Sequence, residues 1–385
     1  MESATRIPQP TIRDHEIYKR LAAHLDNLPA GFPSTESGVE MRILRRLFTP
    51  EEAELAVSLT LLPEEPRVVA RRAGLSREVA ARRLEEMAKK GLVLRDAPQT
   101  GPIRYMAAQY LVGIWEYHVN DLDKELIKDQ NEYLPYLSEH AWKVPQMRTI
   151  PVGRSITPDH KVLPHEMAEE LVRGQKRFSV GPCICRREHT MVGKGCGKRE
   201  ESCLGFGMAV DYRNRNGMGR EIDLQETLDL LKWADESGLV LQPSNTKDAL
   251  WICLCCGCCC QVLKMFKRSP KPAQMAASPF LASHDPGSCL VCGVCVDRCQ
   301  MDALKIEAGE IRLDADRCIG CGLCVSSCPA GSLSLVRKPE SEQPEVPKNI
   351  IEAYTKLGKA RGKITTSGLI KMVVKSKVDR ILTLK

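Results

Sequence analysis

The sequence has no uninterrupted apolar run that approaches the roughly 18 residues needed to span a membrane as a helix. Its most apolar piece, residues 251–263, is shorter and rich in cysteine. Residues 1–8 have no basic segment followed by an apolar one, so we expect no secretory signal peptide. These absences argue against a membrane span and lead us to expect a cytoplasmic location.

Signatures of common catalytic sites are also missing. There is no glycine-rich nucleotide-binding fingerprint, and no nucleophile and base with a recognisable spacing. We therefore assign no catalytic residue. The formal net charge of +7 treats every cysteine as neutral, so it says little about nucleic-acid binding.

What the sequence does contain is cysteine, with 18 among 385 residues. Without an export signal, this number indicates metal ligation in a reducing compartment. Eight of the cysteines form two runs near the C-terminus, each with the order Cys-x-x-Cys-x-x-Cys-x-x-x-Cys. The first run is Cys289, Cys292, Cys295 and Cys299, and the second is Cys318, Cys321, Cys324 and Cys328.

This spacing is that of the bacterial iron–sulfur run. Three closely spaced thiolates wrap one face of a cubane, and the fourth ligand must come from a distant segment. In two-cluster ferredoxins, the fourth cysteine of each run ligates the other cluster. The expected ligands of the first [4Fe–4S] cluster are therefore Cys289, Cys292, Cys295 and Cys328. Those of the second cluster are Cys318, Cys321, Cys324 and Cys299.

The two runs are an internal repeat in which Gly293 and Gly322 occupy the same place. Between the runs, residues 303–306 and 311–313 flank a turn and predict a β-hairpin. A zinc site is the weaker alternative, because zinc sites are typically built from paired Cys-x-x-Cys units. Disulfides are also disfavoured, because they need an oxidising compartment.

Residues 284–337 resemble the two-cluster bacterial ferredoxin domain on these motifs. One position departs from the family pattern. Gln300 follows Cys299 where the family usually has proline. The turn after Cys299 can therefore differ from the one in the family, while the number of ligands is unaffected.

Ten more cysteines lie between residues 181 and 263, which is more than packing alone supplies. One expected site, for a further [4Fe–4S] cluster or a zinc ion, uses Cys183, Cys185, Cys196 and Cys203. For a second site, adjacent side chains on extended backbone point apart, so Cys255 and Cys256 do not easily serve one small site. This alternation favours a second set made of Cys253, Cys255, Cys258 and Cys260.

Two alternatives remain for these ten cysteines. The ligands of each site could equally be mixed between the two segments. A single cluster or zinc ion, with the other cysteines as buried free thiols, is also open. Arg186 and Arg187 beside Cys185 suit a region of gathered thiolate charge, because cations lower thiol pKa values, or they form a solvated pair.

The order of helix and strand signals in residues 41–120 predicts a winged-helix domain. A capping box at Thr49 begins one helix, Pro66 begins the next, and Ser76 caps a third helix that ends at Gly91. Two alternating segments then follow, as the wing strands would. The outward charges of the third helix are mixed, whereas a DNA-contact face is uniformly basic. We therefore favour protein contact, or a role as a structural cap, over DNA binding.

Across residues 41–336, these three regions together resemble a family of cytoplasmic 4Fe–4S proteins. The resemblance implies an α+β multidomain fold with a winged-helix-like N-terminal domain, a mainly helical cysteine-rich middle domain and a C-terminal 2[4Fe–4S] ferredoxin-like domain. The expected parts, in order, are an N-terminal extension (residues 1–40), the winged-helix-like domain (41–120), a helical linker (121–180), the cysteine-rich domain (181–263), a basic linker (264–283), the ferredoxin domain (284–337) and a basic tail (338–385).

The expected function is electron transfer, with single electrons passing through the two C-terminal [4Fe–4S] clusters. The protein would act as a carrier or as a subunit of a larger anaerobic redox complex, more than as a complete enzyme. Its expected partner is a redox protein or an oxidoreductase complex. The alternative is an iron–sulfur redox sensor that binds DNA through the winged helix. A third interpretation, chemistry at an open metal site in the middle domain, needs a cluster with a missing thiolate ligand.

Overall fold

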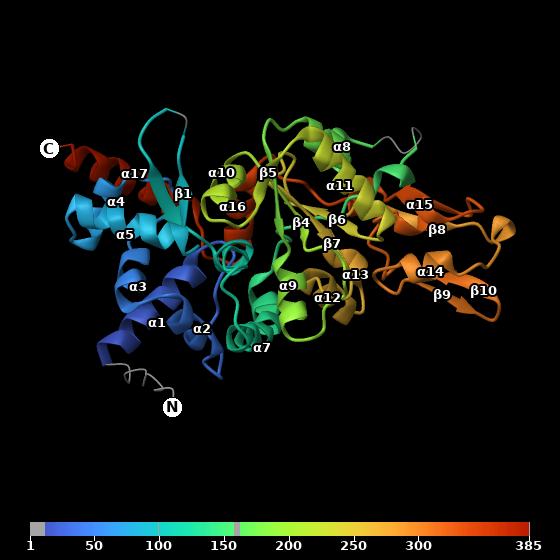
Figure 1. Cartoon of the computed structure of the whole chain (residues 1–385), viewed down its shortest axis with the longest axis horizontal. Helices are drawn as coiled ribbons and strands as arrows, with labels where there is room; N and C mark the ends of the chain where they lie inside the picture. The colour runs from blue at the N-terminus through green and yellow to red at the C-terminus, as the bar shows by residue number, and fades with distance from the viewer. Residues whose placement is uncertain (1–11, 99, 158–161, 385) are drawn as a thin grey trace. The chain divides into compact units, whose positions relative to one another are not determined.

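A computed structural model describes residues 12–98, 100–157 and 162–384 (Figure 1). The chain folds as two compact units. The first draws on the chain up to residue 118, on residues 122–143 and on residues from 358 onward, and the second on residues 119–121 and 144–357. Residues 1–11 of the expected N-terminal extension lie outside the described residues. None of the described helices combines the length and apolar character that crossing a membrane requires.

The first unit is mainly helical and contains one β-hairpin (Figure 1). Its elements are α1 (Ile12–Asn27), α2 (Val39–Leu47), α3 (Pro50–Ala56), α4 (Pro66–Ala73), α5 (Arg77–Lys89), β1 (Val93–Asp96), β2 (Arg104–Ala107), η1 (Tyr110–Ile114), α6 (Trp115–Tyr117), α7 (Lys124–Ala141) and α17 (Thr366–Leu382). Along the chain, α16 (Ile350–Ala360) leads into it from the second unit.

The helix starts in this unit follow from their capping residues. The Thr49 hydroxyl accepts a 3.2 Å hydrogen bond from the Glu52 backbone N–H, and the Glu52 carboxylate accepts a 2.9 Å bond from the Thr49 N–H. This reciprocal capping box begins α3, and the Ser76 hydroxyl caps α5 in a similar way. Strands β1 and β2 then pair antiparallel, with Val93 opposite Ala107. Three helices and a hairpin thus follow in the predicted order, and membership of the winged-helix class stays a prediction.

The end of the chain is part of the first unit, where we had expected only a basic tail. Helix α17 packs against α4. The guanidinium of Arg72 donates bonds of 2.6 Å to both carboxylate oxygens of Glu64 and a 2.7 Å bond to Asp379 of α17. The Glu64 side chain is fully buried, so this is an internal charge network that binds α17 to the unit.

The second unit is built on a five-stranded antiparallel sheet in the order β5-β3-β4-β7-β6 (Figure 1). Its first elements are η2 (Gly153–Ser155), η4 (Pro164–Glu166), α8 (Ala168–Arg173), β3 (Phe178–Pro182), α9 (Ile184–Met191), β4 (Glu201–Phe206), α10 (Met208–Arg215), β5 (Arg220–Ile222), α11 (Leu224–Glu236), β6 (Val240–Pro243), β7 (Trp251–Cys255), α12 (Gln261–Arg268) and α13 (Pro272–Met275). The prediction of a mainly helical middle domain missed this sheet. The cysteine-rich segments themselves form its strands β4 and β7.

The C-terminal half of the second unit has the hairpin that the sequence predicted. Its elements are β8 (Phe280–His284), η5 (Pro286–Ser288), α14 (Val294–Arg298), β9 (Leu304–Glu307), β10 (Glu310–Leu313), α15 (Leu323–Ser327), β11 (Leu333–Arg337) and η6 (Glu340–Glu342). Strands β9 and β10 pair with Ile306 opposite Ile311. Strand β11 pairs with β8, which begins before the expected domain boundary at residue 284.

One hydrophobic core joins the sheet to the C-terminal half of this unit. Leu254 of β7 and Leu263 of α12 belong to the same buried cluster as Met301, Ile319 and Leu323. The ferredoxin half also has a buried cluster of its own, which includes Cys295, Leu304 and Ile311. The expected division into a middle domain, a linker and a ferredoxin domain stays a prediction.

Candidate metal centres

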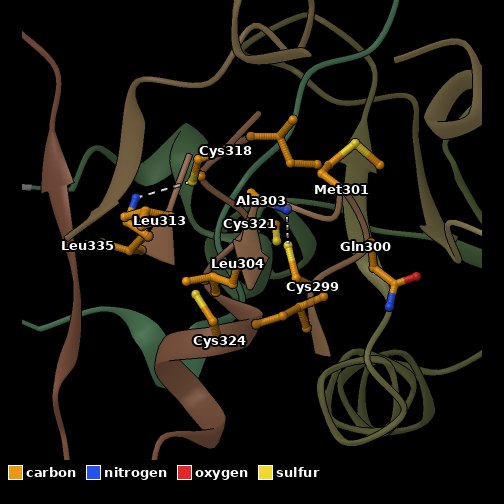
Figure 2. A pocket seen from close by; sticks show the side chains of 15 residues that line it. Cys299, Gln300, Met301, Ala303, Leu304, Leu313, Cys318, Cys321, Cys324 and Leu335 are labelled. Carbon is orange, nitrogen blue, oxygen red and sulfur yellow. Dashed lines mark hydrogen bonds between the residues drawn. The ribbon is translucent and has the colours of Figure 1, made fainter. Parts of the chain in front are cut away.

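The second cysteine run lines a cavity with about 390 Å³ of space not filled by atoms (Figure 2). Its cysteines are Cys318, Cys321 and Cys324 of that run, together with Cys299 of the first run. The backbone N–H of Ala303 donates to the Cys299 sulfur at 3.2 Å, and the N–H of Ala282 donates to the Cys318 sulfur at 3.3 Å. Four sulfurs around a cavity, with N–H groups directed at them, fit the ligand environment of a cluster.

A second cavity, with about 270 Å³ of unfilled space, has the reciprocal composition. It is lined by Cys289, Cys292 and Cys295 of the first run, together with Cys328 of the second. The backbone N–H of Val291 donates to the Cys289 sulfur at 3.4 Å, and the Ser332 hydroxyl lies 3.3 Å from the Cys328 sulfur. The structure thus brings together the two quartets that the sequence predicted, each with its fourth cysteine from the other run.

Each run turns into a short helix at an equivalent glycine. Gly293 begins α14 with φ of 80°, and Gly322 begins α15 with φ of 73°. These left-handed conformations are accessible to glycine without the steric cost of a Cβ atom. At Gly322 a Cβ would also lie 2.0 Å from the Ser155 hydroxyl oxygen. The repeat therefore needs glycine here to return the chain toward its cavity.

Burial makes the thiols of the second cysteine run, which line the first of these cavities, weak acids. It raises the pKa of Cys318, raises that of Cys321 to about 12 and raises that of Cys324 well above its usual value. Neighbouring cysteines add to the effect at Cys321 and Cys324. A bare thiolate is thus unstable in this cavity, whereas a thiolate bound to iron has its charge compensated.

The ten cysteines of the middle region separate into a group of six and a group of four. The six-cysteine group comes from both segments and consists of Cys183, Cys185, Cys203, Cys253, Cys255 and Cys260. Its thiols form a continuous chain of contacts, in the order Cys183, Cys185, Cys260, Cys255, Cys253, Cys203. Sheet pairing holds part of the group, because Cys203 of β4 lies directly opposite Cys253 of β7.

The thiols of the six-cysteine group perturb one another strongly. The hydrogen bond with Cys203 is the main cause that lowers the pKa of Cys253 to about 6, and it raises the pKa of Cys203 well above its usual value. In the same way, the contact with Cys185 is the main cause that lowers the pKa of Cys260. The group is suited to carry several thiolates when a metal centre supplies the compensating charge.

The four-cysteine group consists of Cys196, Cys256, Cys258 and Cys259, whose sulfurs all lie within 4.8 Å of one another. The sulfur of Cys196 lies 3.9 Å from that of Cys256, and the sulfurs of Cys258 and Cys259 are also 3.9 Å apart. Burial raises the pKa of Cys196, but the Lys198 backbone N–H and the three other cysteines together lower it to about 7. Four sulfurs in this arrangement can bind one metal ion.

The structure groups these cysteines differently from the two sets that we expected. Cys196 lies with the 256–259 segment and not with Cys183, Cys185 and Cys203. Cys258 lies in the four-cysteine group and not with Cys253, Cys255 and Cys260. Cys256 and Cys259 were absent from both expected sets. Each group therefore contains cysteines from both segments, which is compatible with the alternative of mixed ligands.

Two arginines contact the cysteine groups. Arg186 is 2% exposed and donates to the backbone carbonyls of Arg199, at 2.8 Å, and Leu254, at 2.7 Å. It also interacts with the thiols of Cys183 and Cys256, and so lies between the two groups. Arg213, which the sequence did not single out, donates to the Cys203 sulfur at 2.9 Å.

Arg187 follows Arg186 in the sequence but makes different contacts, so these two arginines do not act as a pair. Arg187 forms a 3.0 Å ion pair with Glu200 in a partly exposed position. Both ring nitrogens of His189 are hydrogen-bonded. Nδ1 lies 2.7 Å from the Cys185 carbonyl oxygen, and Nε2 lies 2.7 Å from the Lys264 amine. Neither ring nitrogen is therefore available to a metal in this arrangement.

Comparison with known proteins identifies one part of the chain. The family model described as a 4Fe–4S binding domain matches residues 311–334, which contain the second cysteine run. No curated protein and no solved structure matches the chain. The match and the clustered cysteines identify an iron–sulfur protein of mixed helix and sheet, with a ferredoxin-like region near its C-terminus that supports a role in electron transfer.

Proposed function

We propose that the protein transfers single electrons through two [4Fe–4S] clusters in its C-terminal half. The first cluster takes Cys289, Cys292, Cys295 and Cys328 as ligands, and the second takes Cys318, Cys321, Cys324 and Cys299. The observation that carries this proposal is the interleaving of the two runs around two cavities. Each cavity is completed by a cysteine from the other run, so the two clusters share a short connecting framework suited to electron transfer between them.

The first cluster is the better placed to exchange electrons with a partner protein. Cys292 is exposed, and the side chain of Leu290 beside it is 70% exposed. Val294 and Ile306 are also exposed apolar side chains in this region. Apolar side chains near an exposed cluster ligand suit brief docking of a redox partner, either a separate protein or another subunit of a redox complex.

The second cluster faces the interior of the unit, and this arrangement supports a route onward to the middle region. Cys299 and Cys321 pack against the same buried core as Cys253 and Cys255 of the six-cysteine group. We propose that the six-cysteine group holds a further iron–sulfur cluster. Its buried position, several perturbed thiols and the adjacent cation of Arg213 support this assignment. Electrons would then pass from the surface through the two ferredoxin clusters to the middle region.

Iron and acid-labile sulfide, counted per chain in protein purified without oxygen, test this proposal. Three [4Fe–4S] clusters predict about twelve iron atoms with equal sulfide, while about eight would restrict the clusters to the C-terminal half. Replacement of Cys253 by serine should lower the iron content and leave the C-terminal clusters reducible. Protein that contains no iron or sulfide would contradict the assignment of the two ferredoxin clusters. A count of about eight iron atoms per chain, all of them retained in the Cys253→Ser variant, would contradict the further cluster in the six-cysteine group.

A second candidate function is that of an iron–sulfur redox sensor that binds DNA. The observation that favours it is the succession of α4, a turn at Gly74, α5 and the β1–β2 hairpin, which has the order of a winged helix. The exposed side chains of α5 carry both signs, with Arg77, Arg82 and Lys89 beside Glu78 and Glu86. Mixed charge is better suited to protein contact, so we place this function second.

Filter binding to duplex DNA across a salt series separates the two candidates. A DNA-binding regulator would show affinity that falls steeply with salt and prefers particular sequences. The electron-transfer proposal predicts weak binding without sequence preference. Oxidised and reduced protein should be compared, because a redox sensor would differ between the two states.

A further inference from the structure

The four-cysteine group has the dimensions of a site for one metal ion. Its four sulfurs lie within 4.8 Å of one another, and two of the pairs are 3.9 Å apart. A tetrahedral zinc ion with Zn–S distances of about 2.3 Å places its sulfur ligands about 3.8 Å apart. In a cubane each thiolate binds a different iron atom, so its four thiolates lie farther apart. We propose that Cys196, Cys256, Cys258 and Cys259 bind one zinc ion, distinct from the iron–sulfur clusters.

The ferredoxin quartets provide an internal comparison. Each of these quartets lines an open cavity of its own. Among the residues that the structure describes, the group at Cys196 is the one whose four cysteine sulfurs all lie within 4.8 Å. One chain thus contains two kinds of cysteine quartet, open ones suited to an inorganic cluster and a compact one suited to a single ion.

The local backbone explains how the 256–259 segment supplies three of the four ligands. Strand β7 ends at Cys255, and residues 257–259 form a turn. Within this turn the chain reverses, so Cys256, Cys258 and Cys259 converge on one point. Cys196 reaches the same point from the loop between α9 and β4. Four thiolates with no open position are typical of a structural zinc site.

The turn also separates neighbouring cysteines between two centres. Cys255 contacts the six-cysteine group, while Cys256 beside it belongs to the zinc site. Cys260 and Cys259 are divided in the same way. A zinc ion bound by Cys256 and Cys259 would therefore fix the backbone on either side of it and hold Cys255 and Cys260 in place.

Arg186 is a buried cation beside the proposed zinc site. Its side chain is buried, and within the described residues its recorded partners are two backbone carbonyls, the Ser202 hydroxyl and cysteine thiols. None of these partners of Arg186 is a carboxylate. A buried cation needs a compensating charge, and a zinc ion bound by four thiolates carries a net negative charge that would supply it.

Zinc has one stable oxidation state in proteins, so this ion would not carry electrons. Its role would be to hold the six-cysteine group at fixed geometry while that group changes oxidation state. The zinc site therefore extends the proposed function without forming part of the electron route.

X-ray absorption at the zinc edge tests the site in the unaltered full-length protein, purified without oxygen. Elemental analysis should find about one zinc ion per chain, and the absorption spectrum should show four sulfur ligands at about 2.3 Å. Absence of zinc, iron in its place, or nitrogen or oxygen ligands would overturn the proposal. This measurement needs no variant and does not depend on any activity.

Two adjacent substitutions show which residues bind the zinc ion. Cys256→Ser should lower the zinc content about tenfold or more, since it removes a direct ligand. Cys255→Ser is the matched control, because it alters the neighbouring buried cysteine of the six-cysteine group and should leave the zinc content unchanged. The electron paramagnetic resonance signal of the reduced ferredoxin clusters, retained in both variants, would verify the fold. Full zinc content in folded Cys256→Ser protein, or equal zinc loss in both variants, would contradict the assignment.

Discussion

The backbone N–H of Gly257 donates a 2.6 Å hydrogen bond to the side-chain carbonyl oxygen of Gln300. A Cβ atom at Gly257 would lie 2.6 Å from the Gln300 backbone oxygen, so glycine is required for this approach. Gln300 directly follows Cys299, where the ferredoxin family usually has proline. The departure from the family pattern thus coincides with a contact between the ferredoxin half and the 256–259 turn, a bond that a proline side chain cannot form.

Replacement of Gln300 by alanine should weaken this contact. We expect a loss of about 1 kcal/mol in the stability of the second unit, because the Gly257 N–H loses its acceptor. The signal of the second cluster should shift as well, since Cys299 is adjacent. Thermal unfolding and a redox titration measure the two effects. Gln225→Ala, at an exposed position of α11, is the control and should change neither, and an identical response of both variants would refute the role of the contact.

We propose that the two runs exchange the fourth ligands of their clusters, and serine substitutions test this. Cys328→Ser should disturb the cluster of Cys289, Cys292 and Cys295, and Cys299→Ser the cluster of Cys318, Cys321 and Cys324. Each variant should lose up to about four iron atoms or convert one cluster only. Paramagnetic resonance of the two reduced variants should give complementary spectra. If each substitution disturbed the cluster of its own run, the interleaved assignment would be wrong.

Arg186 and Arg187 are adjacent but should respond very differently to replacement by methionine. Arg186→Met removes a buried cation that faces thiols of both middle groups, so we expect loss of metal from that region. Arg187→Met removes a partly exposed ion pair with Glu200 and should cost no more than about 1 kcal/mol. Zinc and iron analysis of both variants measures the difference. Equal metal contents in the two proteins would show that the buried charge is not needed.

Because Glu64 is ionised and buried, we predict that the first unit loses stability in acid. Burial tends to raise the pKa of Glu64, but hydrogen bonds from Arg72 and Thr60 and the Arg72 charge together lower it below its ordinary value of 4.5. A lowered carboxyl pKa stabilises the folded state above about pH 4.5, and this contribution is lost as the pH falls through the folded-state pKa.

Glu64→Gln should therefore destabilise the first unit at pH 7 by about 3 kcal/mol, because it breaks a buried ion pair of Arg72. The difference from wild type should shrink as the pH falls below 4.5. Unfolding followed by circular dichroism at several pH values measures this. Glu86→Gln, exposed on α5, should be nearly silent at every pH. A constant difference between Glu64→Gln and wild type at all pH values would mean that ionisation of Glu64 is not the cause.

The ferredoxin quartets could be predicted from the sequence because their geometry is mostly local. Three cysteines of each cavity lie within a few residues of one another in the sequence, and the repeat indicates where the fourth comes from. Prediction of the hairpin at β9 and β10 succeeded for the same reason. Strand β8 was missed, because its place depends on pairing with β11, which follows it by about fifty residues.

The middle region was harder to predict because its sites depend on distant pairings and on one turn. Alternation along an extended strand holds for Cys253 and Cys255 on β7, and it separates Cys255 from Cys256. The expectation then extended the same alternation to Cys258, although residues 257–259 form a turn that reverses the chain. The approach of Cys196 to this turn has no local signal in the sequence.

The measurement that tests the central claim most directly is a reductive titration of oxygen-free protein, followed by paramagnetic resonance. The account predicts that the two C-terminal clusters each accept one electron, with spin signals that interact because the clusters lie close together. Cys292→Ser and Cys321→Ser should each remove or alter one of the signals. A colourless protein that takes up no electrons from dithionite and gives no signal would contradict the account.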